Sequence, residues 1–140
     1  MRPKPITIAE VEYVAFRFAE KFMKWNEPFP SFGTRFPNIL EGCLVQPFLK
    51  LYKKDLYRGI VGKASNLFYF MVKNHPFKNG NKRIAIMSLL YFLRKNNKWL
   101  YMSNEDLYNF ALNVSKSKPA SREKIIIYIQ DIIKKNLADF

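Results

Sequence analysis

An apolar run near the middle of the chain constrains the fold more than any other feature. From Ile84 to Leu93 only Ser88 interrupts the apolar character. A helix that is apolar all round is a buried one, and this run is too short to cross a bilayer. The strong turn dipeptide Asn79-Gly80 stands just before it. The sequence therefore predicts a buried central helix from Asn81 to about Asn96.

Helical spacing of apolar residues predicts further helices around this central one. A capping box of Thr7 and Glu10 starts the first, and its predicted apolar face holds Ile8, Val11, Ala15, Phe18, Phe22 and Trp25. The predicted spans are, in chain order, about Ile8–Lys24, Asn38–Lys50, Leu56–Asn74, Asn104–Lys116 and Arg122–Leu137. The expected fold class is all-α: one compact helical bundle around the buried central helix, in a single domain over residues 1–140.

Caps and breakers set the expected ends of these helices. Asp55, Ser103 and Ser121 are the predicted N-caps of the last three outer helices. Prolines break the stretch from Pro28 to Pro37 into a loop, and loops of this length are often functional. The stretch Ile125–Ile129 also suits a strand, but apolar residues continue beyond it at helical spacing, which favours a helix.

The charge of the chain implies an anionic partner. The formal net charge is +13, and residues 50–83 hold nine Lys or Arg against one acid, Asp55. Nucleotide, nucleic acid, an anionic membrane surface and an acidic protein are all candidates for this excess. The stretch Leu51–Arg58 interleaves basic and aromatic residues, a pattern that also suits nucleic acid. Because aromatic residues at helical spacing are more often core, nucleic acid is not the expected partner.

Cysteine content and the N-terminal segment point to a cytoplasmic location. The chain has a single cysteine, Cys43, which excludes an internal disulfide and fits a reducing compartment. Without a second histidine to activate it, Cys43 is interpreted as a small buried apolar residue. The basic start of the chain leads into an amphipathic segment, so neither a secretory signal nor a membrane span is expected.

The stretch from His75 to Arg83 has the chemistry of a phosphate site. Pro76 ends the preceding helix and leaves His75, the only histidine, exposed on a loop. The amides of Gly80, Asn81 and Lys82 should then point out of a helix N-terminus, which favours an anion. Lys82 and Arg83 stand in the first helical turn, where cations oppose the helix dipole. A bound polyphosphate would turn these unfavourable charges into ligands.

This nine-residue stretch resembles the signature of the Fic/Doc family, His-x-Phe-x-(Asp/Glu/Asn)-(Gly/Ala)-Asn-(Gly/Lys)-Arg. Seven defined positions agree, and the likeness to the small Doc-type branch extends over roughly residues 30–116. The resemblance implies a Fic-type helical fold in which the loop Pro28–Pro37 corresponds to a flap that can form a short β-hairpin. It also implies a nucleoside triphosphate, ATP or another NTP, and Mg²⁺ as cofactors.

Roles for the residues of this stretch follow from the chemistry together with the resemblance. His75 is the expected general base, with an ordinary exposed loop histidine as the alternative. Asn79 occupies the metal-coordinating position of the family, where an acid is common, and its amide oxygen makes a weaker Mg²⁺ site. Gly80 and Asn81 are expected to bind phosphate oxygens. Lys82 and Arg83 are expected to neutralise phosphate charge during catalysis.

Two positions favour one of the two chemistries found in the family. Members that transfer AMP generally have Gly at the position of Lys82 and a second Arg at that of Ile86. The resemblance is therefore to a Doc-type toxin, which moves the γ-phosphate of an NTP to a Ser or Thr hydroxyl of a target such as a translation factor. AMP transfer is the alternative reaction, and an inactive basic binding module is a third reading because of Asn79. The family's inhibitory signature is absent from the sequence, so a separate acidic antitoxin-like partner is expected.

Overall fold

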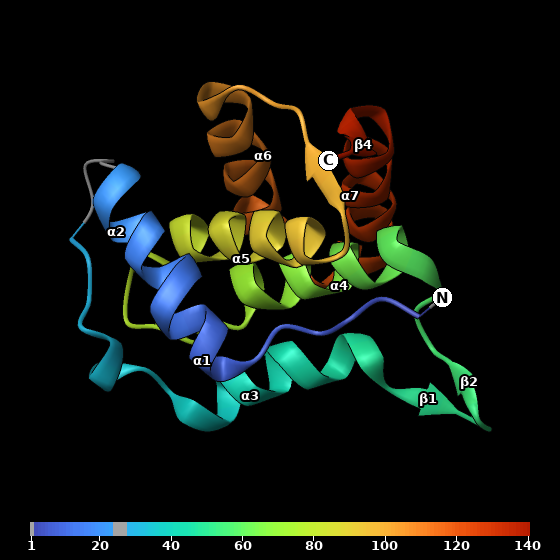
Figure 1. Cartoon of the computed structure of the whole chain (residues 1–140), viewed down its shortest axis with the longest axis horizontal. Helices are drawn as coiled ribbons and strands as arrows, with labels where there is room; N and C mark the ends of the chain where they lie inside the picture. The colour runs from blue at the N-terminus through green and yellow to red at the C-terminus, as the bar shows by residue number, and fades with distance from the viewer. Residues whose placement is uncertain (1, 24–27) are drawn as a thin grey trace.

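The structure is a computed structural model that describes residues 2–23 and 28–140 (Figure 1). Its α-helices are α1 (Ile8–Glu10), α2 (Arg17–Phe22), α3 (Pro37–Val45), α4 (Gly59–Lys73), α5 (Asn81–Lys95), α6 (Asn104–Lys116) and α7 (Arg122–Asn136). Short 3₁₀ turns cover Phe32–Thr34, Gln46–Phe48 and Pro119–Ser121. The all-α fold class is confirmed, and Ile125–Ile129 belongs to helix α7. None of the described helices has the length and apolar character needed to cross a membrane.

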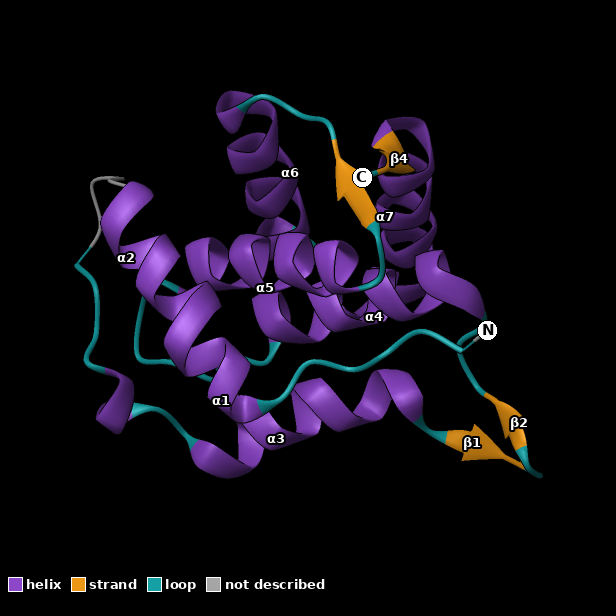
Figure 2. Ribbon diagram, in the orientation of Figure 1, coloured by secondary structure: helices purple, strands orange, loops and turns teal. Residues whose placement is uncertain are grey.

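Two small antiparallel strand pairs accompany the helices (Figure 2). Strand β1 (Lys50–Leu51) pairs with β2 (Lys54–Asp55), and β3 (Lys98–Leu100) pairs with β4 (Leu137–Asp139). The hairpin expected as a flap in the loop Pro28–Pro37 is not formed there, since residues 28–36 hold one 3₁₀ turn and no strand. The β1–β2 hairpin lies instead between α3 and α4. Strand β4 also takes Leu137, which ends α7 one residue earlier than predicted.

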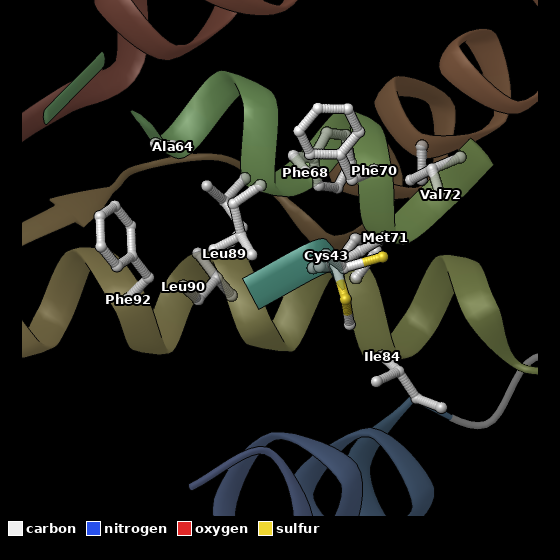
Figure 3. Packing of buried hydrophobic residues seen from close by; sticks show 14 of the residues in the cluster. Cys43, Ala64, Phe68, Phe70, Met71, Val72, Ile84, Leu89, Leu90 and Phe92 are labelled. Atoms are coloured by element: carbon white, nitrogen blue, oxygen red, sulfur yellow. The ribbon is translucent and has the colours of Figure 1, made fainter. Parts of the chain in front are cut away.

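The core forms between α4 and α5, which lie side by side (Figure 1). Figure 3 shows Met71 of α4 beside Cys43 of α3, with Ile84 of α5 on the side of α5 that faces the first helix. The prediction of a buried central helix is confirmed for α5, and α4 lies beside it with all ten of its residues from 63 to 72 buried. Polar residues gave α4 an amphipathic pattern in the sequence, but Lys63 and Asn66 find partners inside the fold. Asn66, for example, donates to the Gly62 carbonyl at 2.8 Å.

The first helix changes its buried face part-way along. A π-helical segment, Val11–Phe16, separates α1 from α2. A π turn inserts one residue and rotates the helical residues beyond it, so Phe16 and Ala19 are buried while the predicted core residues Phe18 and Phe22 are exposed. The rest of the predicted face, Trp25, and the predicted end at Lys24 lie outside the described residues.

Of the three predicted caps, Ser103 is confirmed, Ser121 occupies the N-cap position of α7 without a capping bond, and Asp55 is wrong. Ser103 does cap α6, accepting from the Asp106 amide at 3.1 Å. Ser121 lies in a 3₁₀ turn and makes no capping bond to α7. Asp55 lies in β2 rather than at the start of α4, because its carboxylate accepts from the buried Lys63 ammonium at 3.0 Å and from Arg2 at 3.1 Å. These ion pairs hold the pKa of Asp55 below its usual range, with the hydrogen bond from Lys63 as the largest cause.

A hydrogen-bonded cluster around Glu10 ties the first helix to the end of α5. The Glu10 carboxylate accepts three hydrogen bonds: from the Tyr91 hydroxyl at 2.6 Å, from the Lys95 ammonium at 2.8 Å and from the Thr7 amide at 2.9 Å. Burial acts to raise the pKa of Glu10, but the hydrogen bonds from Lys95, Tyr91 and Thr7 outweigh it and lower the pKa.

We expect this cluster to make the stability of the fold pH-dependent. Because the pKa of Glu10 is lower in the folded than in the unfolded chain, its stabilisation is present above the unfolded value and is lost as the pH falls through the folded value. Replacing Glu10 with Gln should cost about 1 kcal/mol at neutral pH and less in acid. Thermal melts of both proteins from neutral into acid pH measure this, and parallel curves would contradict it.

Candidate active site

The loop between α4 and α5 places the only histidine at the surface. Helix α4 ends at Lys73, with Asn74 as its C-cap, as predicted from Pro76. His75 follows with φ of 50°, a left-handed conformation that costs a residue other than glycine about 1–2 kcal/mol. The side chain is exposed. Strain of this kind persists where the surrounding structure enforces it, and it concentrates at functional sites.

A buried aromatic anchor holds the loop in place. Phe77 is 1% exposed, and its ring lies 5.6 Å from that of Phe16 and 5.9 Å from that of Phe32, measured between centroids. The Phe36 amide donates to the Pro76 carbonyl at 2.9 Å. The segment that was expected to form the flap therefore packs against the loop between α4 and α5, and Phe77 anchors this loop in the core.

Asn81 closes the loop through its side-chain amide. Its Oδ1 accepts from the Phe77 amide at 3.0 Å, and its Nδ2 donates to the Phe77 carbonyl at 2.8 Å. The same Nδ2 lies 3.5 Å from Nδ1 of His75. Asn81 thus fixes the backbone that carries the histidine, a positioning role that sequence reasoning missed because it depends on the folded loop. Direct binding of phosphate by Asn81 stays a prediction.

Gly80 starts α5 in a geometry that requires glycine. Its φ is 71°, and an added Cβ would lie 3.2 Å from Cδ1 of Phe29 and 3.3 Å from Cδ of Pro30. No side chain caps α5, and its first turn contains no acid. The N-terminal end of a 15-residue helix therefore faces the loop with its amide donors uncapped by side chains, which suits an anion.

The two cations of this turn have different surroundings. Lys82 is partly exposed. Arg83 is 3% exposed, and its guanidinium donates to the carbonyls of Met23 at 3.2 Å and Pro28 at 3.0 Å. It also lies 4.7 Å from the ring centroid of Phe29. In this structure Arg83 therefore binds the chain that leads out of α2, a contact across more than fifty residues that no local pattern reveals.

Asn79 fits the metal-coordinating position in one specific respect. Its Oδ1 is buried and has no hydrogen-bond partner in the structure. A buried amide oxygen without a partner is a suitable ligand for a hard cation such as Mg²⁺. The described residues contain no group of three or more His, Cys, Asp or Glu that could hold a metal ion. A cation here would take most of its ligands from phosphates and water.

Cys43 takes no part in this site. It is fully buried in the core, and burial raises the pKa of its thiol to about 12. A thiol with so high a pKa is protonated at neutral pH and is not a nucleophile. The interpretation as a small buried apolar residue is confirmed.

Comparison with known proteins agrees with this geometry. Residues 15–93 match the model of the Fic/DOC family, which is more than half of the chain. The chain belongs to the Fic/DOC family. The match contains the whole loop and α5 up to Leu93, so every candidate residue of this Fic/DOC site lies within it. It begins before residue 30 and ends before residue 116, the limits expected from the sequence. No curated protein and no solved structure matches the chain.

Membership sets the general class of chemistry. Fic/DOC proteins are transferases that generally move nucleotide-derived groups onto proteins. The exposed histidine, the uncapped helix terminus and the adjacent cations of this chain are the groups such a transfer needs: a base for the acceptor and donors for phosphate.

Proposed function

We propose that this Fic/DOC protein transfers the γ-phosphate of a nucleoside triphosphate to a Ser or Thr hydroxyl of a target protein. The proposal rests on two residues at the start of α5: Lys82 stands in the first turn, and Ile86 is fully buried one turn later. Members that transfer AMP generally have Gly and a second Arg at these positions. A buried Ile86 provides no second phosphate clamp, and a lysine in place of glycine at position 82 would narrow the space available to an α-phosphate at the start of α5.

His75 is the proposed general base of this reaction. Its imidazole accepts the proton of the target hydroxyl while the hydroxyl oxygen attacks the γ-phosphorus. The bond from the γ-phosphorus to the bridging oxygen breaks, the nucleoside diphosphate leaves with the electron pair, and a phosphoester remains on the target. The first-turn amides of α5 and the charge of Lys82 stabilise the phosphate oxygens, and Arg83 adds positive potential from its buried position. Mg²⁺ would neutralise further phosphate charge, held by Oδ1 of Asn79.

A cavity beside the histidine supports a protein substrate. It has a volume of about 360 Å³ and is lined by Asn38, Ile39, Gly42, Gln46 and Asn74. Asn74 precedes His75 in the chain, so the cavity lies beside the start of the loop that carries the proposed base. Three of its lining side chains are amides, which both donate to and accept from a peptide backbone. We assign this cavity to the acceptor segment of the target.

The partners proposed for the protein follow from its charge. A net charge of +13 favours an acidic antitoxin-like protein as the inhibitor of the enzyme. A translation factor remains the proposed class of target. Both proposed partners depend on the resemblance of the chain to Doc-type toxins.

Mass spectrometry of cellular proteins after incubation with the enzyme, ATP and Mg²⁺ tests the proposal. We expect a phosphate on a Ser or Thr of one principal target. An added AMP would establish the alternative reaction, and an unmodified proteome with a well-folded enzyme would establish the inactive binding module. The latter reading is favoured by one observation, the neutral Asn79 at the metal position.

Replacing Asn79 with Asp tests the metal site directly. A carboxylate binds Mg²⁺ more strongly than an amide oxygen, so Asn79→Asp should reach half-maximal activity at a Mg²⁺ concentration roughly ten-fold lower than the native protein. Asn79→Leu has a similar volume and no oxygen, and it should need more Mg²⁺ than the native protein. Activity is measured against Mg²⁺ concentration in all three. Superimposable curves would show that Asn79 does not bind the metal.

A further inference from the structure

The β1–β2 hairpin projects from the end of the molecule opposite the catalytic loop (Figure 1). It leads into the N-terminus of α4, whereas His75 follows the C-terminus of that helix. Helix α4 has 15 residues, so the two features are about 22 Å apart along it. A ligand of the hairpin therefore occupies a surface that the transfer reaction does not use.

The turn of the hairpin is strained and presents an aromatic ring to solvent. Tyr52 and Lys53 form the two-residue turn with φ of 50° and 66°, the positive values that a type I′ turn requires. Asn-Gly satisfies such a turn without strain, but this chain has neither residue there. The Tyr52 side chain is 90% exposed and is not a core residue. Nucleic acid was not the expected partner because aromatic residues at helical spacing are usually core residues. Tyr52 is exposed on a hairpin turn, so that objection does not apply to it.

Basic residues surround this ring. Lys50, Lys53, Lys54 and Arg58 are all exposed, and none forms an ion pair with the described residues. The one acid of the hairpin, Asp55, is already bound by Lys63 and Arg2. Three more cations extend the positive end of the molecule through the adjoining cavities: Arg2 and Lys4 in one, and Lys134 beside Arg58 in the other.

We propose that this hairpin binds single-stranded nucleic acid, with a base stacked on Tyr52 and the phosphates on the surrounding cations. Stacking on an exposed aromatic ring within a basic surface is the usual way in which proteins hold single strands. Cations lie on both faces of the hairpin, since Lys50 pairs with Asp55 across the strands while Lys54 pairs with Leu51. A flexible polyphosphate can contact both faces at once.

The hairpin suits a membrane surface less well. Its exposed leucines are Leu49, Leu51 and Leu56, and two of them pair at its base, where the Leu56 amide donates to the Leu49 carbonyl at 3.0 Å. The outermost residues are Tyr52 and a charged lysine. Insertion into a bilayer requires the apolar residues at the tip, where this hairpin has only Leu51 close to the turn.

Fluorescence anisotropy with a labelled 20-nucleotide oligouridylate tests the proposal on the full chain. The affinity for RNA should fall steeply as the salt concentration rises. Each phosphate contact to a single strand contributes about 0.7 to the slope of log K against log salt, so the double variant Lys53→Gln, Lys54→Gln should reduce that slope by about 1.4. Lys116→Gln with Lys118→Gln removes the same charge from exposed positions near the other end of α4 and should leave the slope unchanged. Equal effects of the two pairs, or displacement of the RNA by polyglutamate at equal charge, would overturn the proposal.

Substitutions in the turn separate binding from folding. Replacing Tyr52 with Asn and Lys53 with Gly should raise the melting temperature, because the strain is removed, and should weaken RNA binding roughly ten-fold or more. Tyr101→Ala removes another exposed tyrosine and should bind as the native protein does. Unchanged RNA binding by the Tyr52→Asn, Lys53→Gly variant would contradict the proposal. So would binding of the native protein to phosphatidylglycerol vesicles without binding to RNA.

Discussion

Replacing His75 with Asn is expected to lower transfer to the target by about 10²- to 10⁴-fold without lowering thermal stability. Asn carries no base, but it tolerates the left-handed conformation that His75 adopts at φ of 50°. The side chain is exposed, so no cavity is opened. Ala is the poorer replacement here because it would keep the backbone strain. Initial rates and thermal melts of the two proteins measure the effect.

Chemical rescue distinguishes a base from a structural residue. His75→Gly removes the ring and also suits the positive φ. Because the site is open to solvent, imidazole added to the buffer can occupy the vacated position and should restore part of the activity of His75→Gly. The Asn variant, whose side chain fills the position, should respond less. A His75→Asn protein that transfers at the native rate would contradict the role of this residue.

Replacing Asn81 with Ala is expected to damage both the fold and the activity. The Phe77 amide and carbonyl would lose their buried partners, at a cost of about 1–3 kcal/mol for each group. Since this pair holds the backbone that carries His75, we expect at least a hundred-fold loss of transfer. Urea denaturation and initial rates measure the two effects. Asn109→Ala, at an exposed position of α6, is the matched control and should be near native in both.

An Asn81→Ala protein of native stability would show that the bonds to Phe77 do not hold the loop. Normal stability with lost nucleotide affinity would instead assign Asn81 to the phosphate directly, as the sequence suggested.

Local signals were sufficient to predict the helix that carries the site. Pro76 ends α4, the Asn79-Gly80 turn precedes α5, and an apolar run then requires burial. Each of these effects acts over a few residues, so it can be read without knowledge of the tertiary structure. The same holds for Ser103, whose cap lies within one turn of the helix it starts.

The features that the sequence did not reveal depend on contacts between distant segments. The carboxylate of Asp55 binds Arg2, a residue 53 positions away, and this contact draws it into a hairpin instead of a helix cap. Arg83 bonds to the carbonyls of Met23 and Pro28, which only the folded chain brings near α5. The π segment rotates the buried face of the first helix, and it contains no glycine or proline from which the change could be predicted. Hydrophobic periodicity assumes a regular α-helix and therefore assigned Phe18 to the core.

ATP labelled separately at the α and γ positions identifies the group that the enzyme transfers. Incubation of the native protein, Mg²⁺ and the target with each labelled ATP shows which phosphorus reaches the acceptor, and His75→Asn serves as the blank. With Lys82 in the first turn of α5 and Ile86 buried, we predict that the γ label is deposited on Ser or Thr and the α label is not. Deposition of the α label by the native protein would contradict the phosphoryl-transfer account and establish AMP transfer in its place.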